Sequence, residues 1–146
     1  MAQYNIHHTC GHEETVQIYG TNVHGERQRK AEWRKAEWLE SKPCRDCERE
    51  AMREENLTGA AELTGSDKQV SWANDLRAKA IGDIKAKLAK IDTQYIAAPQ
   101  EWKDAQRKAG EAIITAMLAE TSAKTIIDNR LDLVSHYGAV AQQAAN

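Results

Sequence analysis

The sequence predicts a mainly α-helical protein with a small N-terminal β-hairpin: a zinc-stapled β-hairpin and helix module followed by an α-helical hairpin or bundle. Three observations support this fold class. The helix formers Ala, Glu, Lys, Gln and Leu dominate the chain after residue 26. Two short stretches before that point alternate apolar with polar residues, which is typical of a half-buried hairpin. All three cysteines lie in two short motifs within the first third of the chain, and clustered thiols favour a bound metal ion.

Composition limits the compartment and the class of partner. The 146 residues carry a net charge of −2, and 29% of the side chains are charged. Dedicated nucleic-acid-binding proteins normally have a basic excess, so this balance argues against that class while leaving room for a local basic patch. No apolar run is long enough to span a bilayer, and the N-terminus lacks the pattern of a signal peptide. We therefore expect a cytoplasmic protein that does not enter a membrane, in a reducing compartment that favours metal binding over disulfides.

Residues 3–8 and 15–19 are predicted strands, joined by a turn that contains Cys10-Gly11-His12. Their apolar side chains share one face of the hairpin. These residues are Tyr4, Ile6, Val16 and Ile18. A two-stranded hairpin is marginally stable alone, so we expect a metal ion or a helix to hold it.

Two helices are predicted next, over 26–41 and over 44–56. Pro43 separates them, because the residue before a proline is disfavoured in the α conformation. A near-duplicate of Lys-Ala-Glu-Trp places Trp33 and Trp38 five residues apart, a spacing that does not match a helical turn. We expect one of these tryptophans to cover the hairpin and the other to be partly exposed.

Residues 57–65 begin and end with Leu-Thr-Gly, and we interpret them as a hinge between a zinc module (1–56) and a helical domain (66–146). The segment from Ser66 to Gln69 has the form of a capping box, which predicts the start of a helix. Apolar residues at three- and four-residue steps then predict one helix of about eight turns. They are Val70, Ala73, Leu76, Ala80, Ile84, Leu88, Ile91 and Tyr95.

Further helices are predicted in the remaining sequence, and the two longest should pair antiparallel. Pro99 suits the first turn of one of them, and Gly110 within it either costs about 1 kcal/mol relative to Ala or allows close packing. Its expected inward residues are Trp102, Ala105, Ala109, Ile113, Ala116 and Met117. A shorter helix with Ile126 and Ile127 should end near Asn129. The apolar residues of the last amphipathic segment are Leu131, Leu133, Val134, Tyr137 and Val140.

Cys44 and Cys47 form a Cys-x-x-Cys knuckle, and Cys10 is the other cysteine of the chain. Three thiolates and one imidazole are donors that tetrahedral Zn²⁺ prefers. We predict a structural Zn²⁺ with His12 as the favoured fourth ligand, because His12 lies in the turn. The alternatives for that position are His7 and His8. A catalytic zinc is disfavoured, since four protein ligands leave no open position for water.

Other interpretations of these residues have less support. A thioredoxin-like redox pair would follow a strand of a βαβ unit, whereas this Cys-x-x-Cys follows a helix and a proline; inert thiols are the remaining alternative. We interpret Trp72 and Trp102 as core residues rather than platforms for nucleobases. The basic residues of 26–41 alternate with Glu, which favours a solvated face of ion pairs. They are Arg27, Arg29, Lys30, Arg34 and Lys35.

The order of motifs also resembles a protein family. The resemblance covers roughly residues 4–80, and residues 123–130 look similar too. The motifs that carry it are, in order, Cys-Gly-His, Gln-Ile-Tyr-Gly, Glu-Arg-Gln-Arg-Lys, Glu-Trp-Leu-Glu, Cys-x-x-Cys and Leu-Thr-Gly-Ser-Asp-Lys-Gln-Val-x-Trp-Ala-x-x-Leu-Arg. This order resembles small zinc proteins of bacterial phages and mobile elements, sometimes labelled after the zinc tail of the preprotein translocase ATPase. The resemblance implies Cys10, His12, Cys44 and Cys47 as ligands. The doubled Lys-Ala-Glu-Trp unit and the extra His7-His8 depart from the pattern.

These observations predict a non-catalytic protein that binds a host macromolecule. We find no nucleophile–base pair, phosphate-binding loop or paired carboxylates, so we expect no enzymatic activity. The resemblance implies, in its sharpest form, an anti-CRISPR protein that binds an RNA-guided nuclease and blocks the loading of target DNA. The alternative is a zinc-containing DNA-binding accessory or regulatory protein, which the basic residues Arg27, Arg29, Lys30 and Arg34 would suit.

Overall fold

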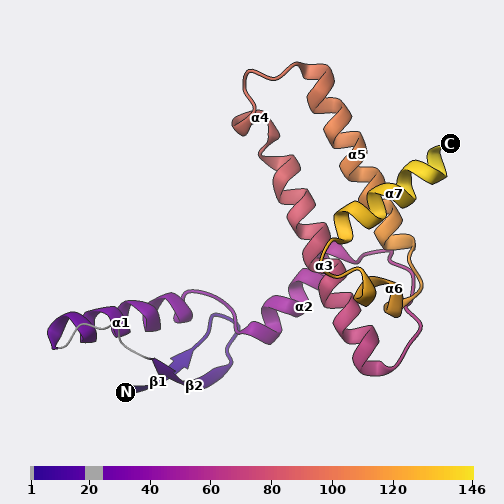
Figure 1. Cartoon of the computed structure of the whole chain (residues 1–146). Helices are drawn as coiled ribbons and strands as arrows, with labels where there is room; N and C mark the ends of the chain where they lie inside the picture. The colour runs from indigo at the N-terminus through magenta and orange to yellow at the C-terminus, as the bar shows by residue number, and fades with distance from the viewer. Residues whose placement is uncertain (1, 19–24) are drawn as a thin grey trace. The chain divides into compact units, whose positions relative to one another are not determined.

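The computed structural model describes residues 2–18 and 25–146 and confirms the predicted fold class. The chain divides into two compact units, Met1–Ala51 and Met52–Asn146. The first contains the β-hairpin, and the second is built of helices (Figure 1). The division falls within helix α2 (Arg45–Asn56), and residues 57–65 belong to the second unit.

The first unit begins with two antiparallel strands, β1 (Ala2–His7) and β2 (Glu13–Ile18). Strand β2 starts two residues before the predicted stretch 15–19, and residue 19 lies outside the described residues. Tyr4 lies opposite Val16 in the register of the pair, so the apolar side chains share one face of the hairpin as predicted.

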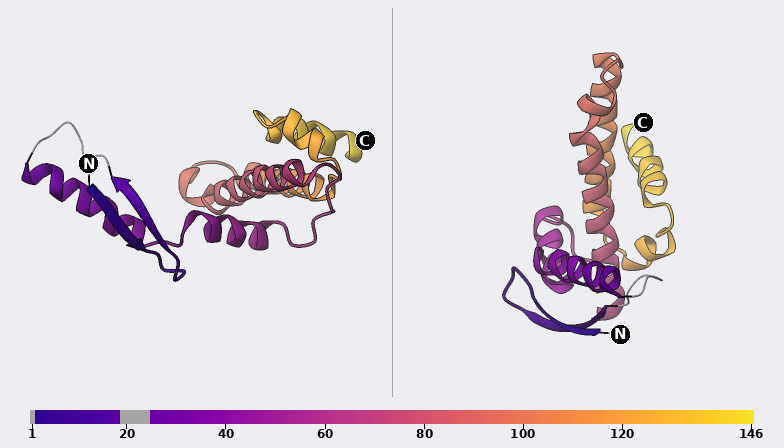
Figure 2. Two further views of the ribbon diagram at one scale, coloured as in Figure 1. Left: turned by 90° about the horizontal axis from the view of Figure 1, so that it is seen from below. Right: turned by 90° about the vertical axis from the view of Figure 1, so that its left-hand side faces the viewer.

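Helix α1 (Glu26–Glu40) packs along that apolar face (Figure 2). The core that they share is small: Ile6, Ile18 and Ala36 are buried, and Tyr4, Val16 and Leu39 pack around them. The Tyr4 hydroxyl adds one polar contact by donating to Oε2 of the buried Glu32 at 3.1 Å. A core of this size supports the expectation that the hairpin needs a further constraint.

Both tryptophans of α1 are exposed, Trp33 by 61% and Trp38 by 57%. The prediction that one of them covers the hairpin is therefore wrong. Five residues along a helix correspond to a separation of about 140° around its axis, which places the two rings on opposite flanks. The side facing the hairpin is occupied instead by Glu32 and Ala36.

The second unit is organised around two long antiparallel helices, α3 (Asp67–Ala89) and α5 (Gln100–Ala119) (Figure 1). The predicted capping box is present, because Ser66 accepts the N–H of Gln69 and the Gln69 side chain accepts the N–H of Ser66. The shorter helices α6 (Ala123–Asp128) and α7 (Leu133–Ala145) pack against α3 and α5 respectively. The buried core residues are Ala73, Ile81, Ile84, Met117, Ala123, Ile126, Leu133 and Tyr137.

The long helix is shorter than the predicted eight turns. Helix α3 ends at Ala89, and a short helix, α4 (Ile91–Gln94), follows. The turn at Lys90, between α3 and α4, brings Asp92 close to two cations of α5. The Asp92 carboxylate lies 2.7 Å from Nη2 of Arg107 and 3.7 Å from Nζ of Lys103. Among the described residues, no helix combines the length and the apolar character needed to cross a membrane.

Several apolar residues that were expected to face inward are exposed instead. Trp102 is 39% exposed and pairs with Tyr95 at a centroid distance of 5.1 Å, while Trp72 is 47% exposed beside Arg130. Leu131 is 93% exposed because it lies in the connection between α6 and α7. Ala105, Ala109, Val134 and Val140 are exposed as well. The core is thus concentrated in the part of the unit where α6 and α7 cover α3 and α5.

Residues 57–65 are held by backbone hydrogen bonds. The N–H of Ala61 donates to the Leu118 carbonyl at 2.8 Å, and the N–H of Thr64 donates to the Thr121 carbonyl at 2.7 Å. A parallel bridge also pairs Thr64 with Ser122. This segment therefore lines the end of α5 within the second unit.

Gly110 and Gly138 are both helical, but only Gly110 is crowded. A Cβ at Gly110 would lie 2.8 Å from Cδ1 of Leu88, so α3 and α5 approach closely there, whereas a Cβ at Gly138 would make an ordinary contact, 3.8 Å from Ile113. We expect Gly110→Val to lower the free energy of unfolding by about 1–3 kcal/mol and Gly138→Ala to raise it by about 0.5–1 kcal/mol. Urea denaturation measures both changes, and effects of the same sign would contradict the packing difference.

Candidate metal centre

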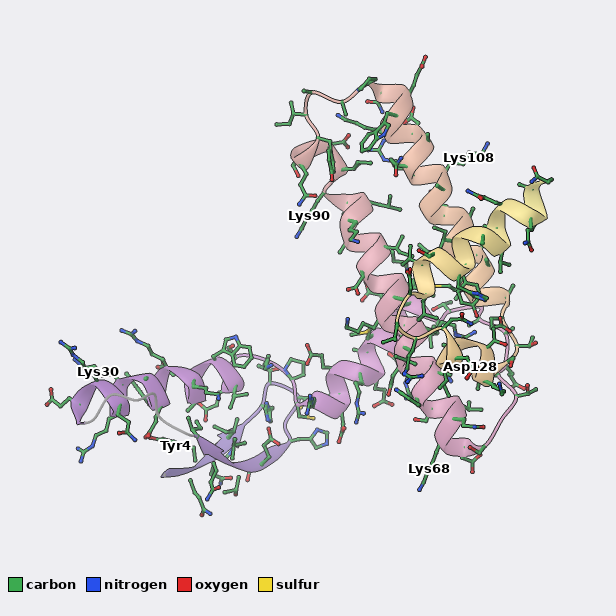
Figure 3. The ribbon with its side chains drawn as sticks, in the orientation of Figure 1. Tyr4, Lys30, Lys68, Lys90, Lys108 and Asp128 are labelled. Carbon is green, nitrogen blue, oxygen red and sulfur yellow. The ribbon has the colours of Figure 1, made fainter. Side chains whose placement is uncertain are left out.

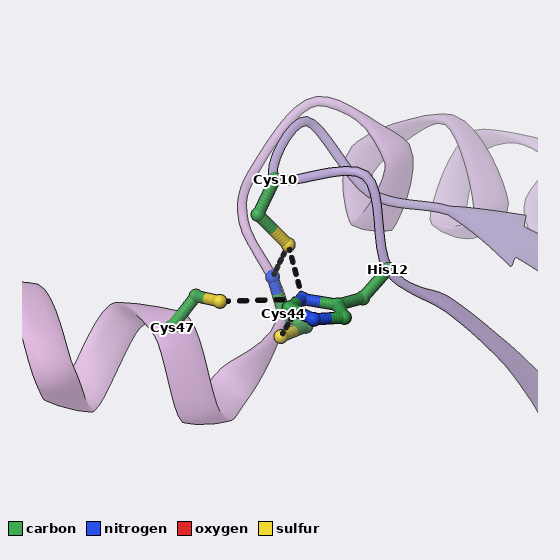
Figure 4. Close-up of side chains that lie close together, drawn as sticks. All are labelled: Cys10, His12, Cys44 and Cys47. Carbon is green, nitrogen blue, oxygen red and sulfur yellow. Dashed lines mark hydrogen bonds between the residues drawn. The ribbon is translucent and has the colours of Figure 1, made fainter.

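The turn of the hairpin presents two of the predicted ligands. Gly11 has a φ of 87°, a left-handed conformation that glycine adopts at little cost. Its N–H donates to the His8 carbonyl at 3.0 Å, and the His8 N–H donates to the His12 carbonyl at 2.9 Å. These bonds close a tight turn from which Cys10 and His12 extend toward the start of α2 (Figure 4).

The other two predicted ligands lie at the N-terminus of α2. Cys44 immediately precedes the helix, and its carbonyl accepts the N–H of Glu48 at 2.9 Å; Cys47 lies in the first turn. The N-terminus of a helix carries partial positive charge, which stabilises thiolates. The N–H of Cys44 also donates to Sγ of Cys10 at 3.3 Å, so the two knuckles are in direct contact.

The four side chains converge on one point (Figure 4). The candidate ligand atoms of Cys10, His12, Cys44 and Cys47 all lie within 4.8 Å of one another. Nδ1 of His12 lies 3.3 Å from the sulfur of Cys10, 3.6 Å from that of Cys44 and 3.3 Å from that of Cys47. His12 is exposed and the cysteines are partly exposed, so an ion can reach the cluster from solvent.

The pKa values of Cys10 and Cys47 are shifted in opposite directions. The hydrogen bond from the Cys44 N–H lowers the pKa of Cys10 to about 6. In contrast, the hydrogen bond with the Cys44 side chain, together with burial, raises the pKa of Cys47 to about 12. Thiolates held this close repel one another, so the cluster carries three negative sulfurs only when a cation lies among them.

The donor set and its spacing fit a tetrahedral Zn²⁺. Zinc–sulfur bonds of about 2.3 Å and zinc–nitrogen bonds of about 2.0–2.1 Å place the two ligand atoms about 3.6 Å apart at the tetrahedral angle. The three separations between His12 Nδ1 and the sulfurs, from 3.3 Å to 3.6 Å, are close to that value. All three cysteines are free of disulfide bonds, so each can supply a thiolate.

His7 and His8, the alternative fourth ligands, have other partners. Nδ1 of His7 lies 2.8 Å from Oε1 of Glu13 in an exposed pair across the hairpin. Nε2 of His8 lies 2.8 Å from Oε1 of Glu14. The cluster that the structure brings together therefore contains His12 and neither of the alternatives.

His8 has a structural role that the sequence analysis missed. Its side chain is buried, and Nδ1 lies 3.1 Å from the carbonyl oxygens of both Leu39 and Lys42 at the end of α1. The hydrogen bond with Glu14 raises the pKa of His8, since these neighbours are all acceptors and favour the protonated ring. The alternation of the strand could have indicated this role, because His8 lies two residues after the buried Ile6 and so on the same face.

The histidine assignment predicts different effects for three alanine substitutions. His12→Ala removes a ligand and should weaken zinc binding by more than about a hundredfold, since losing a partner of a ligand already costs 10–100-fold. His7→Ala removes only an exposed contact and should leave zinc affinity nearly unchanged. His8→Ala should lower the stability of the first unit while the purified protein still binds zinc. Competition with a fluorescent zinc chelator measures the affinities, and a stronger effect for His7→Ala than for His12→Ala would refute the assignment.

Comparisons with protein-family models, curated proteins and solved structures give no match.

Proposed function

We propose that Cys10, His12, Cys44 and Cys47 hold one structural Zn²⁺ that fastens the hairpin to the start of α2. The observation that carries this proposal is the convergence of three sulfurs and one imidazole nitrogen within 4.8 Å. A bound Zn²⁺ supplies four coordinate bonds that link segments far apart in the sequence. Four protein ligands close the coordination shell and leave no position for a reactive water, which favours a non-catalytic role.

Metal analysis of protein purified without chelators tests the zinc site. We expect about one zinc ion per chain. Cobalt substitution should give the intense thiolate-to-metal absorption and the visible bands of a tetrahedral site. A protein that contains no zinc, and that binds neither zinc nor cobalt when they are added, would refute the proposal.

As to its role in the cell, the chain is a non-enzymatic protein of a phage or mobile element that binds a host macromolecule. In the sharpest form of this proposal it is an anti-CRISPR protein, which binds an RNA-guided nuclease and blocks the loading of target DNA. The resemblance of the motifs in residues 4–80 supports an origin in a phage or mobile element. The closed donor set supports the absence of zinc catalysis.

A groove in the second unit supports a protein partner. It has a volume of about 650 Å³ and lies among α3, α5 and residues 130–134. Leu131, Val134 and Trp102 line it and are 93%, 43% and 39% exposed. Exposed apolar surface of this kind, rimmed by charged side chains, is typical of protein interaction sites. The charged residues of the groove are Lys79, Asp83, Lys87, Arg130 and Asp132.

A reconstituted nuclease tests this role. The full chain is added to purified RNA-guided nuclease with its guide RNA, either before or after target DNA, and DNA binding and cleavage are measured. We expect inhibition only when the protein is added first. Leu131→Glu should abolish inhibition, whereas Ile96→Glu alters an exposed aliphatic residue that does not line the groove and should have no effect. No inhibition across several nuclease subtypes would refute the anti-CRISPR form of the proposal.

A further inference from the structure

We propose that one edge of α1 binds single-stranded nucleic acid, holding its phosphates by basic side chains and stacking one base on Trp38. This surface, named here the Trp38 stripe, consists of Arg27, Lys30, Arg34, Lys35 and Trp38 of α1 together with Lys42, which lies two residues beyond the end of the helix. The site lies entirely in the first unit. It does not depend on the function proposed above, whose groove lies in the second unit.

Helical geometry separates the charges of α1 into two edges. Arg27, Arg34 and Trp38 follow one another at steps of seven and four residues, which places them on the same side of a helix. Lys30 and Lys35 flank this line on either side. Glu32 is buried against the hairpin, and Glu26, Glu37 and Glu40 lie on the other edge, around Trp33. Lys30 borders that edge, because it lies four residues after Glu26 and seven before Glu37.

The basic side chains of the stripe are available to an anion. With the described residues, Arg27, Lys30, Arg34 and Lys35 form no ion pair, and all four are exposed. The expectation of an ion-paired helix face is therefore wrong for this edge. Arg29 is not part of the stripe, because it faces the other edge and acts electrostatically on Tyr4. Unpaired cations along one edge complement a chain of phosphates.

Trp38 distinguishes nucleic acid from other anions. Trp38 is 57% exposed, and Nζ of Lys42 lies 3.8 Å from its ring centroid, so one face of the ring already contacts a cation. The electron-rich face of an indole attracts cations and stacks on nucleobases, but it does not attract the carboxylates of an acidic protein. Bases offer free faces in a single strand and not in a duplex. The combination of exposed indole and surrounding cations therefore favours single-stranded nucleic acid.

Fluorescence anisotropy with the full chain tests the proposal, using labelled oligothymidine of about 16 nucleotides. Affinity should fall as salt rises, with a log–log slope of about −3, as expected for four or five phosphate contacts on a single strand. Trp38→Ala should weaken binding about tenfold through loss of stacking. The double variant Arg34→Gln with Lys35→Gln should weaken binding and bring the slope closer to zero by about 1.4, since each lost phosphate contact contributes about 0.7.

Two matched controls separate the stripe from general effects of charge and exposure. Trp33→Ala removes an equally exposed indole from the other edge of α1 and should leave affinity unchanged. Lys68→Gln with Lys108→Gln removes the same charge from the second unit (Figure 3) and should weaken binding far less than the stripe variant. Zinc content and circular dichroism of each variant establish that the fold is retained.

Several outcomes would overturn the proposal. The first is that the oligonucleotide does not bind at low salt. The second is that Trp33→Ala and Trp38→Ala lower the affinity equally. The third is that duplex DNA binds as tightly as the single strand and that Trp38→Ala has no effect on this binding. Polyglutamate that displaces the oligonucleotide at equal charge concentration would assign the stripe to an acidic protein instead. None of these results decides the function proposed above, which the nuclease assay with the Leu131→Glu variant tests separately.

Discussion

Replacing Cys44 or Cys47 with serine is expected to unfold the first unit while most of the helix in the second unit remains. Removing a thiolate abolishes a tetrahedral site, and structural zinc sites contribute about 10–16 kcal/mol of apparent binding free energy at neutral pH. The remaining core, with Ile6, Ile18 and Ala36 as its buried apolar residues, is too small to replace that contribution.

Hydrogen exchange measured by mass spectrometry would detect this partial unfolding. Amides of β1, β2 and α1 should exchange as in an unfolded chain, and those of α3 and α5 should stay protected. Glu48→Ser is the matched control, because it introduces serine at an exposed position of the same helix and leaves the ligands intact. A Cys47→Ser protein that retains zinc and melts like the parent would refute the role of the metal.

Arg77→Met is expected to have the largest effect on the second unit, lowering its free energy of unfolding by about 3–5 kcal/mol. The Arg77 side chain is buried and donates to the carbonyl oxygens of Met117 at 3.4 Å, Glu120 at 3.3 Å and Ala61 at 3.2 Å. It also donates to Oδ1 of Asn74 at 2.8 Å. Methionine can fill the space but offers these acceptors no donor, and of the four only the Met117 carbonyl has another hydrogen-bond donor among the described residues, the Glu120 N–H at 3.3 Å.

Lys79→Met provides the control for Arg77. Lys79 lies on the same helix, is exposed, and makes only a 3.5 Å surface pair with Asp83, so its replacement should change stability by less than about 0.5 kcal/mol. Urea denaturation followed by the circular dichroism of the helices gives both values. Equal stabilities of the two variants would show that the buried guanidinium does not join residues 57–65 to the end of α5.

The periodicity of the sequence predicted the positions of the helices well, but it predicted poorly which of their apolar residues are exposed. The capping box at Ser66 and the proline at 43 are local signals, and the structure has helix boundaries at both. The exposure of Trp102 and Leu131 depends on how far α6 and α7 extend over the long helices. Apolar spacing alone does not show that coverage, so Trp102 was wrongly expected to face inward, and Leu131 is exposed although it belongs to the apolar residues of a predicted amphipathic segment.

The candidate metal centre could be inferred almost completely, because the chain has few cysteines and they occur in knuckle motifs. The choice among neighbouring histidines was harder, since His7, His8 and His12 all lie near Cys10 in the sequence. What separates them is the partner each one finds: Glu13 for His7, and Glu14 with the end of α1 for His8. Those partners come together only once the hairpin has folded onto α1, so they are a product of tertiary structure.

The spacing of the two knuckles has a mechanical consequence. His12 and Cys44 are separated by 32 positions, so an ion bound to both closes β2 and α1 into a loop. A force applied to the two termini would then pass through the metal–ligand bonds and bypass that loop. The outermost ligands, Cys10 and Cys47, are 37 positions apart in the sequence, so rupture of the whole site in a single-molecule pulling experiment should release about 125 Å of contour length, at about 3.4 Å per residue. Addition of a chelator should remove this step and leave the extension of the second unit unchanged.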